Sequence, residues 1–84
     1  MDKLKYYRKD VDLIDKKIIK FLLSRFQLIK QISDYKRRNK IKIADKIREL
    51  QVIGNVKKYS DKKHRKFIIN IFKDIINYSK KIQK

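Results

Sequence analysis

The chain has 84 residues, of which 26 are Lys or Arg and nine are Asp or Glu, so its formal net charge is +17 at pH 7. This length predicts one small domain, residues 1–84, with so little room for a core that help from a partner chain is expected. The absence of cysteine excludes disulfides and thiolate chemistry. No apolar run approaches the ~20 residues that span a membrane, and no apolar signal core follows Met1, so we expect a cytoplasmic protein.

The positive charge has two interpretations. It could indicate a basic helical module that binds nucleic acid. It could also reflect a composition biased toward Lys and Ile, which leaves most lysines on solvated faces. The second interpretation is favoured, because the lysines are scattered around every expected helix and do not gather on one face.

The first expected element is a helix that starts between Asp2 and Tyr6 and ends near Arg38. Steps of four and three residues define one face of it: Leu4, Arg8, Val11, Asp15, Ile18, Leu22, Arg25, Ile29, Ile32 and Lys36. A second row, Ile14, Phe21, Leu28 and Tyr35, repeats every seventh residue. This period predicts a helix that packs along its whole length against other helices. A reach of ~48 Å for 32 residues is too long for an isolated small globule and predicts a shared, elongated bundle.

Two shorter helices are expected after it. Asn39 is expected to end the first helix in the left-handed conformation, followed by a short extended link. Asp45 is a suitable N-cap for a second helix, about residues 46–58, with Ile47, Leu50 and Ile53 or Gly54 on its inward side. Ser60 or Asp61 can cap a third helix from about Lys62. The face of this third helix reads Ile68, Phe72, Ile76, Ser79 and Gln83. The fold class is therefore all-α, with three helices per chain.

Charged and polar side chains occupy positions where these faces should be apolar. A buried cation is costly unless an anion meets it. Arg25 and Lys36 are 11 residues apart, close to three turns, so both can grip one small molecule. Arg8 lies ~25 Å along the axis from Arg25 and cannot reach that molecule in the same chain. If Arg8 is functional, it serves the site of a partner chain, which predicts an intertwined dimer.

Three motifs that contain these positions resemble those of a known family. The run from Arg8 through Val11, Asp12, Ile14, Asp15, Ile18, Leu22, Arg25, Leu28 and Ile32 to Lys36 is similar to the first helix of the all-α, AroQ-type chorismate mutases. The Asp45-x-x-Arg48-Glu49 run resembles the second-helix motif of that family, and Ser79-x-x-x-Gln83 resembles its C-terminal helix. The link departs from the family, which often has a proline there.

The resemblance implies a homodimer whose long first helices pack together and whose substrate is chorismate. Its site would use Arg25, Lys36, Asp45, Arg48, Glu49, Ser79 and Gln83 from one chain and Arg8 from the other. Conversion of chorismate to prephenate is a pericyclic rearrangement, for which no metal or cofactor is expected. It requires a folded substrate and stabilisation of the charge that builds on the ether oxygen.

Under this resemblance each residue has an expected role. Arg25 and the partner's Arg8 clamp the two carboxylates, with help from Ser79. Lys36 and Gln83 donate to the ether oxygen. Glu49 accepts from the ring hydroxyl beside the backbone N–H of Asp45, and Arg48 lines the site and orients Glu49.

Three alternatives stay open from the sequence. An isochorismate-pyruvate lyase is similar in fold and uses a related cationic site. A basic nucleic-acid-binding module would explain the charge but not the cations on the inward face. A purely structural helical dimer would require the three motifs to be coincidental. His64, the single histidine, lies off the inward face and is expected to be exposed.

Overall fold

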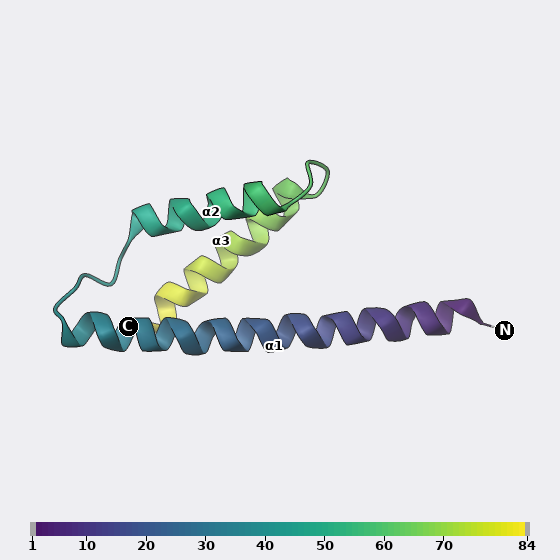
Figure 1. Cartoon of the computed structure of the whole chain (residues 1–84), viewed down its shortest axis with the longest axis horizontal. Helices are drawn as coiled ribbons and strands as arrows, with labels where there is room; N and C mark the ends of the chain where they lie inside the picture. Colours follow the sequence, from purple (N-terminus) through teal and green to yellow (C-terminus); the bar gives the residue numbers. More distant parts are fainter. Residues whose placement is uncertain (1, 84) are drawn as a thin grey trace.

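The computed structural model describes residues 2–83 and contains three helices, with no strand among these residues. They are α1 (Lys3–Arg38), α2 (Lys46–Tyr59) and α3 (Arg65–Ile82). In Figure 1, α1 runs the length of the molecule, while α2 and α3 form a hairpin that returns the C-terminus to α1. The molecule is elongated, with principal extents of 61 × 26 × 16 Å. The predicted all-α class and its three helices are confirmed.

Local hydrogen bonds explain where the helices begin. The Asp2 carboxylate accepts from the Leu4 N–H at 3.1 Å at the start of α1. The Asp45 carboxylate accepts from the Arg48 N–H at 2.9 Å, so the predicted N-cap of α2 is confirmed. Each carboxylate satisfies a backbone donor that the first turn of a helix leaves without a partner.

The predicted end of α1 at Arg38 is confirmed, but the backbone conformation expected for Asn39 and the predicted start of the third helix were wrong. Asn39 is not left-handed, having φ −103°; the positive φ of 54° belongs to Lys40, one residue later. The third helix starts at Arg65 and not near Lys62. Asp61 accepts from the His64 N–H at 2.7 Å and thereby closes a separate turn before α3 begins. The preference of Asp for a cap position was correct, but the capped element is a turn.

The inward face of α2 also differs from the prediction. Ile47 and Leu50 are 72% and 73% exposed, whereas Val52 and Val56 are buried. The spacing of the apolar residues suggested the first pair. The helix instead turns the face of Val52 and Val56 inward, and Arg48 and Glu49 of the pocket described below lie along the same face.

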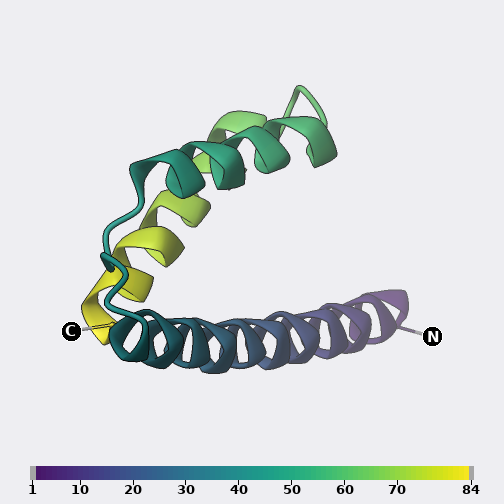
Figure 2. The same cartoon turned by 60° about the vertical axis from the view of Figure 1, so that its left-hand side comes forward.

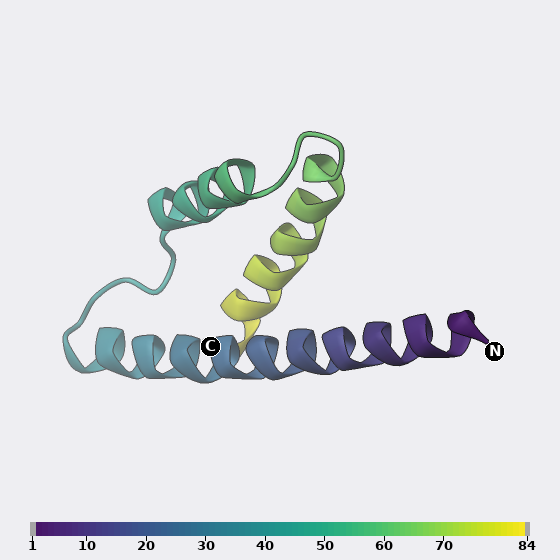
Figure 3. The same ribbon diagram turned by 45° about the vertical axis from the view of Figure 1, so that its right-hand side comes forward.

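The apolar interior of the single chain is very small. Among residues 2–83 the buried hydrophobic side chains are Val52, Val56 and Ile76. Figures 2 and 3 show that the N-terminal end of α1 extends beyond the hairpin without a neighbouring helix. The seven-residue row on α1 is accordingly exposed: Ile14 56%, Phe21 68%, Leu28 58% and Tyr35 56%. No helix within the described residues has the length and apolarity to cross a membrane.

Candidate active site

A pocket of about 140 Å³ lies where α1, the link, α2 and the end of α3 meet. Seven of the eight residues expected at a site line it: Arg25, Lys36, Asp45, Arg48, Glu49, Ser79 and Gln83. Apolar side chains form the rest of the wall, together with Lys80: Ile29, Ile32, Ile43, Val52 and Ile76. The fold therefore gathers residues up to 58 positions apart, from Arg25 to Gln83, around one small space.

Arg25 is held by a serine from α3. Its Nη1 donates to Ser79 Oγ at 3.0 Å, and Ser79 Oγ donates to the Ile75 carbonyl at 2.8 Å. Ser79 is 5% exposed, so its hydroxyl is a fixed acceptor for the guanidinium. This contact orients Arg25 toward α3 and leaves its other N–H groups available.

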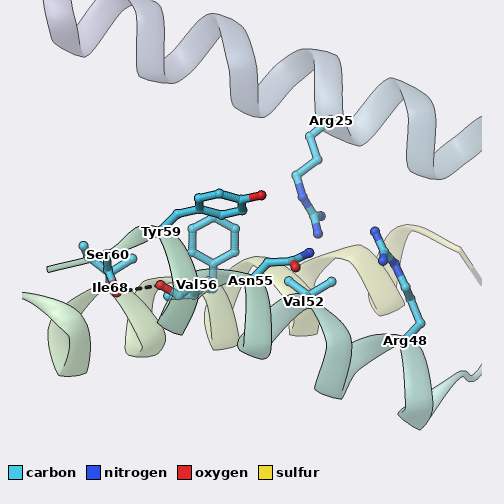
Figure 4. A pocket seen from close by; sticks show the side chains of 9 residues that line it. Arg25, Arg48, Val52, Asn55, Val56, Tyr59, Ser60 and Ile68 are labelled. Carbon is cyan, nitrogen blue, oxygen red and sulfur yellow. Dashed lines mark hydrogen bonds between the residues drawn. The ribbon is translucent and has the colours of Figure 1, made fainter. Parts of the chain in front are cut away.

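Two guanidinium groups face the same space. Figure 4 shows Arg25 on α1 and Arg48 on α2 extending toward each other between the helices. Burial lowers the pKa of Arg25 from its usual value, and the positive charge of Arg48 lowers it further. Both effects disfavour the charged form, so an anion placed between the two groups would be bound favourably.

A second cavity, of about 340 Å³, adjoins the first and shares Arg25, Arg48 and Val52 with it. Figure 4 shows that its other walls include Asn55, Val56 and Tyr59 of α2. Its remaining lining residues, Ser60, Ile68 and Phe72, follow α2 or belong to α3.

Lys36, in the last turn of α1, also lines the first pocket. Its Nζ donates to the Ile43 carbonyl at 3.1 Å, which ties the link to the last turn of α1. An ammonium has three donors, so two remain for a ligand. Although the link lacks the proline that is frequent in the family, Lys36 lines the pocket.

The carboxylates of the pocket have different partners. Glu49 Oε1 lies 3.0 Å from Lys80 Nζ, whereas Asp45 caps α2. No side-chain hydrogen bond or ion pair joins Arg48 to Glu49; Arg48 Nη1 donates to Gln51 Oε1 at 3.3 Å. The orienting role expected of Arg48 therefore stays a prediction, whereas Lys80 forms an ion pair with Glu49.

The C-terminal end of α3 is fastened to α1. The Gln83 carbonyl accepts from Ser33 Oγ at 3.3 Å and from Arg37 Nη2. Gln83 Nε2 donates to the Ser79 carbonyl at 3.0 Å. Ser33 is 1% exposed and Gln83 is 8% exposed, so this end is docked and not frayed.

The sequence analysis missed Ser33, Arg37 and Lys80. A signal existed for Ser33, because it continues the four-three spacing of Leu22, Phe26 and Ile29 on α1. Arg37 and Lys80 gave no comparable signal, because each lies in a cluster of lysines and arginines that looks solvated.

Arg8 is exposed and lines neither of these cavities. It lies in the N-terminal part of α1, ~25 Å along the helix from Arg25. His64 contacts Asp61 at 2.9 Å at the far end of the hairpin, and its side chain is 60% exposed. No group of three or more His, Cys, Asp or Glu side chains within residues 2–83 is arranged to hold a metal ion.

The fold and this pocket define an all-α protein with a cationic site suited to a small anion. The model of the family described as chorismate mutase type II matches residues 7–84. The chain is also 33% identical over 87 residues to a chorismate mutase of Methanocaldococcus jannaschii, an alignment that covers 100% of this chain and 87% of that protein. No solved structure matches it.

The chain therefore belongs to the type II chorismate mutase family and is an isomerase of that class. The resemblance inferred from the three motifs is confirmed. Both matching descriptions name a mutase, so the lyase alternative is not favoured.

Proposed function

We propose that residues 1–84 form a single catalytic domain that rearranges chorismate to prephenate, for phenylalanine and tyrosine biosynthesis in the cytoplasm. The observation that carries this proposal is the meeting of seven expected site residues around one pocket. A pericyclic rearrangement exchanges no proton with the enzyme. The pocket has to fold the dianion and stabilise charge on the ether oxygen.

The proposed roles are those that the family resemblance implies, and the contacts of several side chains support them. Arg25, oriented by Ser79, binds one substrate carboxylate through a guanidinium fork. Lys36 and Gln83, which both line the pocket, donate to the ether oxygen. Glu49 accepts from the ring hydroxyl near the start of α2. The apolar wall, including Ile32 and Ile76, excludes water and strengthens these interactions.

We propose that the working unit is a homodimer in which the partner's Arg8 binds the second carboxylate. The three buried hydrophobic residues found among residues 2–83 are too few to stabilise an isolated chain of this length. The exposed row on α1, Ile14, Phe21, Leu28 and Tyr35, offers the apolar area that a partner helix would cover.

The activity is tested by measuring the loss of chorismate at its ultraviolet band. The purified chain should consume chorismate and release prephenate, and it should not release pyruvate from isochorismate. Pyruvate release with isochorismate as the better substrate would refute the mutase proposal. Tight binding of DNA or RNA at physiological salt, without turnover of either substrate, would favour the basic-module alternative.

Site sharing is tested by mixing two inactive variants, Arg8→Ala and Arg25→Ala. A mixed dimer contains one site with both arginines, so random exchange should restore about a quarter of wild-type activity, as expected for a symmetric two-site dimer. Chain exchange is verified with differently tagged chains. Persistent inactivity in verified mixed dimers would refute the role of Arg8.

A further inference from the structure

Lys80 and Glu49 form an ion pair that joins two helices at the pocket. Lys80 Nζ on α3 lies 3.0 Å from Glu49 Oε1 on α2. The other ion pair within the described residues, His64 with Asp61, spans three positions of one turn. Glu49 is the single glutamate of the chain, and its side chain has no further hydrogen bond or ionic partner among residues 2–83.

Lys80 stands at the outer edge of the site. It lines the pocket and also a neighbouring surface cavity with Arg37 and Ala44. Its side chain is 46% exposed, compared with 29% for Glu49. An ion pair that is exposed to this degree contributes little to folding stability. Stability alone therefore gives weak grounds for placing a lysine against the carboxylate.

The electrostatics of the pocket gives a stronger reason for the position of Lys80 beside Glu49. Glu49 shares the pocket with Arg25, Lys36 and Arg48, all of which attract a carboxylate. A glutamate free to turn would pair with these cations and would compete with the carboxylates of the substrate. Lys80 binds Glu49 from the edge, and one carboxylate oxygen stays available because a carboxylate accepts several hydrogen bonds.

We propose that Lys80 is a positioning residue that holds Glu49 against the wall of the pocket and away from the substrate-binding arginines. The proposal rests on the proposed use of this pocket for chorismate. It predicts that the effect of removing Lys80 depends on the charge of Glu49, since Lys80 acts through that carboxylate.

The test is a double-mutant cycle with Lys80→Met and Glu49→Gln. Lys80→Met alone should raise KM for chorismate about tenfold with a smaller change in kcat. A tenfold effect lies within the range of interaction energies measured between contacting residues. Lys80→Arg should restore KM to within about threefold of wild type, because it keeps the charge and the reach. Lys81→Met, at the next exposed lysine of α3, is the matched control and should leave both constants unchanged.

In the Glu49→Gln background, Lys80→Met should change KM by less than about twofold, since the two substitutions are coupled. An equal rise of KM in both backgrounds would overturn the proposal, because Lys80 would then act on the substrate directly. A lowered midpoint of thermal unfolding with unchanged KM would also overturn it, because the pair would be structural. If Glu49→Gln alone retained wild-type kinetics, the hydroxyl-acceptor role of Glu49 would fail, while loss of the Lys80 effect in that background would still support the proposal.

Discussion

Replacing Lys36 by methionine tests whether its ammonium group stabilises the transition state. The group lies in the wall of the pocket, 3.1 Å from the Ile43 carbonyl, and two of its donors remain for the ether oxygen. Methionine nearly preserves the length and volume of the side chain but removes the charge and every donor. The substitution therefore changes electrostatics more than packing.

The expected loss of kcat can be compared with the expected loss of folding stability. Loss of one preorganised donor to a developing negative charge lowers kcat by about 10²–10³, equivalent to ~2.7–4 kcal/mol in the activation barrier. The same substitution loses the partly buried hydrogen bond to Ile43, which contributes about 1.5 kcal/mol to the free energy of unfolding. The catalytic loss should therefore exceed the loss of stability by a factor of about two.

The assay measures chorismate loss at saturating substrate, with urea unfolding of the same preparation. Lys30→Met is the matched control, because Lys30 is an exposed lysine of α1 that lines none of the site cavities. It should leave both kcat and the unfolding free energy nearly unchanged. A Lys36→Met enzyme that turns over within about tenfold of wild type would refute the reasoning, because no single transition-state donor would have been lost.

Two further predictions concern the docked end of α3. Gln83→Glu should confine activity to acidic pH, because a carboxyl group donates a hydrogen bond only when protonated; a flat pH profile of kcat would contradict the role of Gln83. Ser33→Ala should lower kcat several-fold, because it removes one hydrogen bond to the Gln83 carbonyl, while Ser24→Ala, an exposed serine of the same helix, should not. Equal kcat for the two serine variants would show that the Ser33 hydrogen bond does not position Gln83.

The helices could be predicted because their signals are local. The four-three spacing on α1 continues for more than 30 residues, and Asp45 caps α2 through a hydrogen bond three residues along the chain. The boundary at α3 failed for an equally local reason, since Asp61 caps a turn and helix caps have the same chemistry. Single-residue conformations such as that of Lys40 depend on how the link crosses to Lys36, which sequence spacing does not report.

The residues of the candidate site could be predicted better than their contacts. Cations on a face of apolar residues identified Arg25 and Lys36, and motif spacing added Arg48 and Glu49. The contact between Glu49 and Lys80 joins positions 31 residues apart on different helices. It depends on the angle between α2 and α3, and nothing in the local pattern of either helix encodes that angle.

The polar residues at the end of α3 have two interpretations from the sequence, a frayed helix end or part of a binding site. Ser79 and Gln83 continue the face of Ile68, Phe72 and Ile76, and a frayed helix end would account for them if they were exposed. They are instead 5% and 8% exposed. A buried polar group is costly unless it is hydrogen-bonded, and both side chains have partners at the pocket. Because the buried hydrophobic residues number only three among those described, a chain selected for stability alone would gain by placing apolar side chains at these two positions. Their presence at the pocket therefore supports the proposed binding of a small anion there.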